Sequence, residues 1–406
     1  MLLVTKKITS LVIMFAVIIA VFVFGMRGCL AIYDERSALP PVLYFKNDSS
    51  TILFSLVKYS KTTSYSRKGG LVNKTVSNHY LIQCNDAISG HKILSKEIEN
   101  DVTVKHFPEI ILGAGGNHAW VFLNELLAFN AFTLEKVADV KMIEAKNTSL
   151  KGMMPKEGHY YRFDKESNSV IFTANDGVQW MLHSKTLTAI PYTTPTTPDN
   201  KSDKERLAKK LQDYLQHLQQ LSLHFTQLKI NQDTINGKWI GFYAKEEIES
   251  LNPVVSVAYA GKQEQRRQIY TASYNAVSED KFVIVKPVLP RGTTSAFYLD
   301  AGFLVNKETG KPFYFTDASY LMVYKTAIGE TGKIVVARML PDGTMVWQFD
   351  TELTKWIDWK YKDNRLIIFG NDNRQLNNRE CNIVFSVDLN SGIANNYDYF
   401  KDEARK

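Results

Sequence analysis

The chain has 406 residues, with 49 Lys and Arg against 42 Asp and Glu, so its formal net charge is +7. Its composition, 45% hydrophobic and 22% charged, excludes an intrinsically disordered protein. The chain has three cysteines, which are too few to stabilise a protein of this size through disulfide bonds, and this excludes a disulfide scaffold. The positive surplus is spread along the sequence, and we therefore expect no nucleic-acid partner.

An uncharged apolar segment follows the first residues of the chain. Residues 8–26 provide about 19 residues at 1.5 Å each, just enough to cross a hydrocarbon core of roughly 30 Å. Because Lys6 and Lys7 precede it, the positive-inside rule predicts a cytoplasmic N-terminus. We therefore expect a cytoplasmic tail (1–7), a transmembrane signal-anchor (8–26) and a juxtamembrane linker (27–44), with the bulk of the chain periplasmic or extracellular.

Two other interpretations of this segment stay open. A long apolar helix can belong to a buried core, although the N-terminal position and the lysine pair speak against it. Met26-Arg27-Gly28-Cys29 resembles a degenerate lipoprotein cleavage box, which would make the protein a lipoprotein anchored at Cys29. Arg27 fits that box poorly.

Short apolar runs bounded by polar turns follow from Pro40 onward. Each run has four to seven residues rich in β-branched and aromatic types, which is typical of strands. The clearest runs are 51–57, 79–84, 109–112, 119–123, 169–173, 281–285, 333–337, 365–369 and 382–387. We expect an all-β chain with one helical interruption.

Five segments share a polar residue, two variable residues, Ser or Thr, and then Gly or Leu. They are 86–90, 130–134, 183–187, 306–310 and 388–392, and their first residues lie 44, 53, 123 and 82 positions apart. Such a segment predicts a hairpin, in which a polar side chain bonds its own backbone and the last residue supplies a positive φ. Four of the five carry an apolar residue at the eighth position: Ile93, Val137, Ile190 and Phe313. With Pro341-Asp-Gly-Thr344 near the middle of the last interval, the spacing predicts seven units of 35–50 residues.

An all-β chain with a period near 40–50 residues indicates a β-propeller. We expect about seven blades (six to eight) over 45–400, with a helical insertion at 199–236. The closest copies of the turn, Asp86-Ala-Ile-Ser-Gly90 and Asn306-Lys-Glu-Thr-Gly310, resemble the repeat of quinoprotein-type propellers. Quinoprotein dehydrogenases carry adjacent cysteines and a calcium ion held by acidic side chains, whereas this chain has no adjacent cysteines. The resemblance therefore implies a non-catalytic propeller that serves as an assembly scaffold in the cell envelope. Two antiparallel β-domains are the alternative fold.

A heptad pattern predicts a helix over 202–229. Ser202-Asp-Lys-Glu205 has the form of a capping box, and apolar residues then recur at steps of four and three. They are Leu207, Leu211, Tyr214, Leu218, Leu221, Phe225 and Leu228. These residues could form an oligomerisation seam. Leu215 and Leu223 widen the apolar face, which favours packing on the chain's own β-domain.

Local motifs for chemistry are missing from the sequence. No His-Glu-x-x-His, Walker loop, Gly-x-Ser-x-Gly or Cys-x-x-Cys occurs, and we predict no metal and no cofactor. Gly113-Ala-Gly-Gly116 precedes another strand, so it indicates a β-turn and not a phosphate loop. Cys84 and Cys381 stand in the first and last units, which neighbour each other in a closed ring. They could form a disulfide there, or remain two buried thiols, the alternative we favour.

Together these patterns predict a membrane-anchored, extracytoplasmic β-propeller that binds an envelope protein or a glycan. A propeller enzyme is the competing hypothesis. Its site would be built at the channel mouth, and it would gain support if His118, Asp176, Asp317 and Arg338 gathered in one pocket. A third hypothesis is an oligomeric envelope subunit assembled through the helix at 202–229.

Overall fold

The computed structural model describes residues 35–68, 71–99, 110–193, 224–225, 227–229, 236–244, 266–275, 282–288, 298–306, 311–327, 331–373 and 381–405. These residues form five antiparallel sheets, numbered here from the first to the fifth along the chain. One short helix, α2 (Val140–Lys146), and two 3₁₀ turns, Thr148–Leu150 and Gly158–Tyr160, lie among the strands. The all-β prediction is confirmed, and so is a strand at each of the nine apolar runs named above.

Four of the sheets are meanders, in which each strand pairs with the next one along the chain. The first sheet contains β1 (Glu35–Lys46), β2 (Thr51–Lys68), β3 (Leu71–Asp86) and β4 (Lys92–Glu99). The second contains β5 (Ile110–Gly115), β6 (His118–Leu123), β7 (Glu125–Asn130) and β8 (Lys136–Ala138). The third contains β9 (Tyr161–Asp164), β10 (Ser169–Thr173), β11 (Gln179–His183) and β12 (Ala189–Pro191). The fifth contains β23 (Lys355–Lys362), β24 (Arg365–Asn371), β25 (Ile383–Asp388), β26 (Ala394–Asp398) and β27 (Glu403–Arg405).

The fourth sheet combines two meanders. One contains β14 (Gln227–Lys229), β15 (Asn236–Ala244), β16 (Arg266–Asn275) and β17 (Phe282–Pro287). The other contains β18 (Tyr298–Asn306), β20 (Tyr320–Lys325), β21 (Ile334–Met339) and β22 (Met345–Asp350). The two meet where Arg266 and Arg267 of β16 pair with Leu299 and Tyr298 of β18. The short strands β13 (His224–Phe225) and β19 (Lys311–Pro312) also pair with β18.

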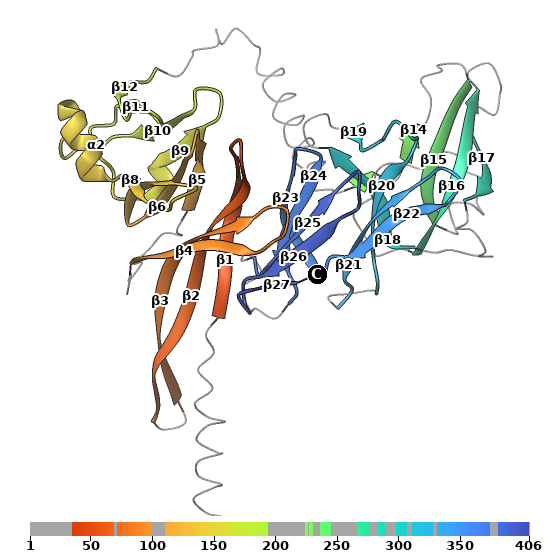
Figure 1. Ribbon diagram of the computed structural model, residues 1–406, viewed down its shortest axis with the longest axis horizontal. Helices are drawn as coiled ribbons and strands as arrows, with labels where there is room; N and C mark the ends of the chain where they lie inside the picture. The colour runs from red at the N-terminus through yellow and green to blue at the C-terminus, as the bar shows by residue number, and fades with distance from the viewer. Residues whose placement is uncertain are drawn as a thin grey trace, which may run out of the picture.

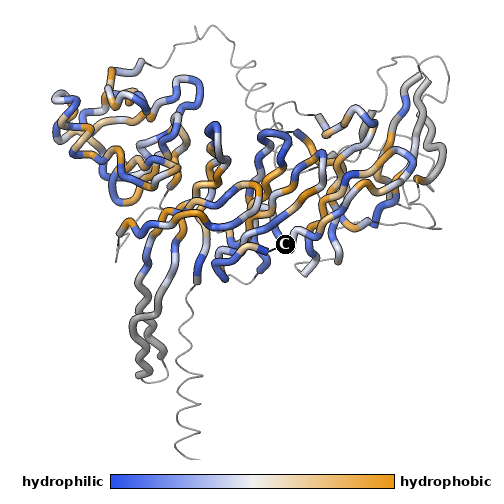
Figure 2. The backbone as a smooth tube through the Cα atoms, in the orientation of Figure 1, coloured by the Kyte–Doolittle hydropathy of each residue, from blue (hydrophilic) through white to orange (hydrophobic). Residues whose placement is uncertain are grey.

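The sheets stand side by side in the order third, second, first, fifth, fourth (Figure 1). Each neighbouring pair shares one cluster of buried apolar side chains, and these clusters form the core of the molecule. Hydrophobic residues accordingly run along the middle of the sheets in Figure 2. The first and last sheets of the chain are therefore direct neighbours, and the backbones of Ala38 and Cys381 exchange two hydrogen bonds of 2.7 and 2.9 Å.

The hairpin prediction is confirmed for four of the five repeated segments. Those at 86–90, 130–134, 183–187 and 388–392 all connect the third strand of a meander to its fourth. In each, the amide of the fifth residue donates to the carbonyl of the first. The fifth residues, Gly90, Leu134, Leu187 and Gly392, have φ between 55° and 75°. Asp86, Asn130 and Asp388 accept two further amides through their side chains.

The remaining segment, 306–310, occupies a different place in its unit. It connects β18 to β19, whose residues Asn306 and Lys311 pair, and residues 307–310 lie outside the described ones. Pro341-Asp-Gly-Thr344 forms the hairpin between β21 and β22. The turn chemistry therefore marks hairpins throughout, but only four copies are equivalent.

Two boundary predictions are wrong. Residues 27–44 were expected to be linker, yet β1 begins at Glu35; its register shifts between Leu39 and Leu43, where Pro40 and Pro41 interrupt the alternation that marks a strand. At the other end, β27 continues the fifth sheet beyond residue 400.

The prediction of a helix over 202–229 is wrong for its last residues, which are the only ones of this segment that the structure describes. Phe225 lies in β13 and Leu228 in β14, because pairing with β18 and β15 overrides the heptad pattern. The other five seam residues, Leu207, Leu211, Tyr214, Leu218 and Leu221, lie outside the described residues.

The predicted anchor cannot be placed on this architecture. Residues 8–26 and Cys29 lie outside the described residues. Within the described part of the chain, no helix is both long enough and apolar enough to span a bilayer.

Candidate binding pocket

A pocket of about 510 Å³ lies where the five sheets approach one another. β1 contributes Pro41, Leu43 and Tyr44, β5 contributes residues 112–114, and β23 contributes residues 358–362. Asn306 from the end of β18 and Lys165 from the turn between β9 and β10 complete the wall. Four of these contributions come from the first strand of a meander: β1, β5, β18 and β23. Among these strands β1 contacts β5 and β23, and β5 also contacts β9, the first strand of the third sheet.

Hydrogen bonds fix the wall between β1 and β23. Lys360 Nζ donates to the carbonyl oxygen of Val42 at 2.5 Å. The hydroxyl of Tyr44 donates to Asp363 Oδ2 at 2.6 Å, and Lys46 Nζ lies 3.2 Å from the same oxygen. Burial and the hydrogen bond to Asp363 raise the pKa of Tyr44, so its hydroxyl stays protonated at neutral pH. The hydrogen bond from Tyr44 in turn contributes to a lowered pKa of the Asp363 carboxyl.

The lining combines aromatic rings with an excess of positive charge. Lys165, Lys360 and Lys362 stand against a single carboxylate, Asp358. Trp359 is only 4% exposed and packs with Tyr361 around Phe313. The partly exposed rings of Tyr44 and Tyr361 offer flat apolar surfaces, and lysine ammonium groups can donate charge-assisted hydrogen bonds to acidic groups.

Close packing against the third sheet explains two of the glycines beside the pocket. A Cβ at Gly113 would lie 2.4 Å from the ring of Phe163, and one at Gly115 would lie 2.3 Å from Ser184 Oγ. Only Gly116 belongs to the turn predicted for this segment, with a φ of 59°. The turn prediction is therefore right at its last residue, whereas Gly113 and Gly115 are strand residues that allow β5 to approach the third sheet.

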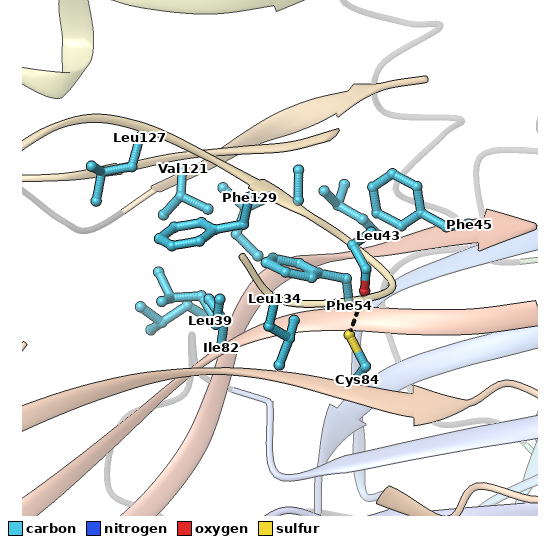
Figure 3. Packing of buried hydrophobic residues seen from close by; sticks show 14 of the residues in the cluster. Leu39, Leu43, Phe45, Phe54, Ile82, Cys84, Val121, Leu127, Phe129 and Leu134 are labelled. Carbon is cyan, nitrogen blue, oxygen red and sulfur yellow. Dashed lines mark hydrogen bonds between the residues drawn. The ribbon is translucent and has the colours of Figure 1, made fainter. Parts of the chain in front are cut away.

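Cys84 and Cys381 are buried free thiols, so the disulfide alternative is not realised in the structure. Cys84 Sγ donates to the carbonyl of Ala131 at 2.8 Å, and Cys381 Sγ donates to that of Ile383 at 3.2 Å. Figure 3 shows Cys84 among the apolar side chains of its cluster. Burial raises the pKa of both thiols to about 12. At neutral pH they are protonated and act as small apolar core residues.

Of the four residues considered for an enzyme site, Asp317 and Arg338 form an ion pair, but His118 and Asp176 lie elsewhere, and the four do not gather in one pocket. Arg338 donates to Asp317 at 2.8 Å, to Ser319 Oγ at 2.7 Å and to the carbonyl of Leu389 at 2.6 Å. It is 7% exposed and ties the fourth sheet to the fifth. His118 donates through Nδ1 to Ser184 O at 3.0 Å, between the second and third sheets. Asp176 caps the turn before β11 by accepting the amide of Val178.

Sequence reasoning missed the pocket residues. Gly113 and Ala114 belong to the glycine-rich segment 113–116, and Asn306 opens the repeated segment 306–310, but neither segment indicated a pocket. The other lining residues belong to no motif. Most of them lie in the first strand of a meander, two strands before the repeated turn. The repeat could therefore have indicated their position.

The sequence matches no protein-family model and is similar to no curated protein.

Proposed function

We propose that this protein is a membrane-anchored, extracytoplasmic β-propeller that binds an acidic glycan in its central pocket. The observation that carries the proposal is a single pocket that receives residues from all five sheets. In a propeller, the first strand of each blade faces the central channel, and that channel is a common place for a ligand.

The topology supports a propeller in two ways. The four single meanders and the two meanders of the fourth sheet make six units, five of four strands and one of five, within the range of six to eight expected from the repeat. The observed order of sheets is also the cyclic order of a ring cut between the third and fourth sheets (Figure 1). In such a ring the first and last blades touch, as the first and fifth sheets do here.

The shape and charge of the pocket support a glycan over a protein partner. A volume of about 510 Å³ suits a small ligand or one arm of a larger one. A protein partner usually needs a flat patch of about 800 Å² on each side. Tyr44 and Tyr361, which are only partly buried, can stack on sugar rings, and the lysines Lys165, Lys360 and Lys362 outnumber Asp358 in the lining, which favours carboxylate groups. The envelope location comes from the predicted anchor at 8–26 and from the resemblance to envelope propellers.

Binding of acidic and neutral oligosaccharides to the full chain in nanodiscs tests this function. We expect the acidic set to bind and the neutral set to bind at least about tenfold more weakly, as loss of a charge-assisted hydrogen bond implies. Lys165→Glu together with Lys362→Glu should weaken binding of the acidic set by about tenfold or more. Both side chains are exposed, so the fold should be unaffected.

Lys185→Glu is the matched control, because Lys185 is an exposed lysine in the turn between β11 and β12 that does not line the pocket. It should leave binding unchanged. Equal affinity for acidic and neutral sugars, or equal effects of the pocket and control variants, would contradict the proposal. Isolation of a protein partner whose affinity does not depend on Lys165 and Lys362 would also contradict the proposal.

A further inference from the structure

The hairpin formed by β2 and β3 extends well beyond the rest of the first sheet. The two strands pair from Ile52 and Asp86 to Lys68 and Leu71. Their neighbours stop earlier, since β1 begins at the pair of Glu35 with Ser60 and β4 ends at the pair of Glu99 with Tyr80. Residues 61–68 and 71–77 therefore pair only with each other among the described residues, and we call them the arm. Figure 1 shows the arm projecting from the sheet.

The sequence of the arm carries charge of one sign only. It contains Lys61, Arg67, Lys68 and Lys74 and no acidic residue. Lys58 at its base continues the pattern, and no Asp or Glu occurs between Asp48 and Asp86. Over the whole chain, by contrast, 49 basic residues stand against 42 acidic ones. This local excess therefore departs from the balance of the rest of the protein.

The base of the arm lies at the end of the first sheet where the chain enters β1. Glu35, the first residue of β1, pairs with Ser60, and the arm begins at the next residue, Lys61. Residues 27–34 separate β1 from the apolar segment 8–26, and eight residues reach at most about 29 Å when fully extended. The eight arm residues 61–68 extend about 26 Å at roughly 3.3 Å per residue. The arm is thus long enough to reach a bilayer that holds segment 8–26.

We propose that the arm docks on the surface of the membrane that anchors the protein, by binding anionic phospholipid headgroups. This inference rests on the proposed anchor. Basic segments close to a membrane are attracted to anionic lipids, and the attraction falls off within about a Debye length of roughly 10 Å. With the anchor as one attachment and the arm as a second, the first sheet is held at a fixed orientation above the bilayer.

The test uses the full chain reconstituted into vesicles of phosphatidylcholine alone or of phosphatidylcholine with phosphatidylglycerol. A fluorophore is attached at Ser66→Cys in the arm, in a Cys29→Ser background, because Cys84 and Cys381 are buried. Lipids with a nitroxide on the headgroup quench the fluorophore when it lies at the membrane surface. We expect at least about twofold quenching in the anionic vesicles, little in the zwitterionic ones, and loss of the quenching at 1 M salt, where the Debye length is about 3 Å.

Two controls locate the effect in the arm. The same fluorophore at Asp176→Cys, in the exposed turn before β11, should show no quenching in either vesicle. Changing Lys61, Arg67, Lys68 and Lys74 to Gln should abolish quenching of the Ser66→Cys probe. The comparison of the two vesicle types needs no arm variant, so it decides the question even if that variant misfolds.

Extraction at alkaline pH separates a failure of this inference from a failure of the proposed anchor. A chain that stays in the vesicles while its arm probe is unquenched in anionic lipid overturns the arm's role and leaves the anchor intact. A chain that is extracted overturns the anchor, and with it the geometry on which the arm's role depends.

Discussion

The first sheet packs against a neighbour on each side, and the two junctions are built differently. Against the second sheet, next along the chain, it contributes apolar side chains such as Phe54 and Leu43, which share one buried cluster with Val121 and Phe129 (Figure 3). Against the fifth sheet, at the other end of the chain, apolar packing is joined by buried polar contacts. The hydroxyl of Tyr399 donates to Ser55 Oγ at 3.1 Å, across 344 residues of sequence.

Further polar contacts follow the same junction. Ser386 Oγ donates to the carbonyl of Ala87 at 3.0 Å, and Asp402 accepts from Arg36 at 2.9 Å and from Lys92 at 2.5 Å. Apolar packing tolerates small shifts between surfaces, whereas buried hydrogen bonds require one register. A short connection already restricts how neighbouring units meet. No short connection fixes the relative position of two units from opposite ends of the chain. The polar contacts between the first and fifth sheets fix it instead.

The largest loss of stability is expected when an aromatic ring is removed from either junction. Phe54→Ala opens the junction with the second sheet, and Phe369→Ala opens the one with the fifth; both rings are at most 1% exposed. Each change should lower the free energy of unfolding by about 3–5 kcal/mol, from lost burial and a residual cavity. Urea unfolding of the full chain in detergent measures this. Val346→Ala, at a residue that is 43% exposed, is the control, and a loss below about 1 kcal/mol at either phenylalanine would show that its junction is not a packed core.

A smaller effect distinguishes the two junctions. Tyr399→Phe removes only the hydroxyl that reaches Ser55, and it should lower the free energy of unfolding by about 1–2 kcal/mol. Combined with Ser55→Ala in a double-mutant cycle, it should give a coupling energy of at least about 0.5 kcal/mol. Tyr160→Phe, at a tyrosine that is 44% exposed, should change stability by less than about 0.5 kcal/mol. If the effects of the Tyr399 and Ser55 changes were additive, this hydrogen bond would not stabilise the junction with the fifth sheet, and the proposed difference between the junctions would be wrong.

The smallest effect is expected from Asp402→Asn and depends on pH. Burial raises the pKa of the Asp402 carboxyl, but hydrogen bonds from Lys92 and Tyr397 and the charge of Arg36 outweigh it, so the pKa lies below its ordinary value of 3.8. A lowered pKa in the folded state stabilises the fold above the unfolded-state pKa, and this contribution is lost as pH falls.

At pH 7, Asp402→Asn should therefore lower the free energy of unfolding by about 1 kcal/mol, the amount typical of partly exposed ion pairs. The difference from wild type should shrink as the pH falls below about 4. Thermal unfolding between pH 3 and pH 7 measures it, with Asp48→Asn in the exposed turn before β2 as the control. A difference that persists unchanged at pH 3 would mean that the carboxylate charge is not its source.

Local features of the fold were predictable because their causes are local. A strand such as 169–173 is rich in β-branched and aromatic residues, and the turn at Asp388–Gly392 carries both its polar cap and its positive-φ glycine in five residues. β1 was missed because Pro40 and Pro41 interrupt its pattern, and its strand conformation depends on pairing with β2. The end of the predicted helix failed for a similar reason, since Phe225 and Leu228 pair with strands distant in sequence.

The pocket could not be predicted because it is a property of the assembly of sheets. Lys165, Asn306 and Lys360 come from three different sheets, and no spacing in the sequence relates them. The repeat correctly predicted that Cys84 and Cys381 lie in neighbouring units. Whether they pair depends on side-chain geometry that spacing does not contain.

The contact between the first and fifth sheets also constrains how the chain acquires its fold during synthesis. The residues that cover one face of β2, among them Phe369 and Tyr399, are made more than 300 residues later. Contacts of such long sequence separation form slowly, and apolar surface that waits for them is prone to aggregate. We therefore expect a nascent chain to carry a first sheet with one uncovered apolar side until its last strands emerge, and to be more prone to aggregation during that interval than the finished molecule.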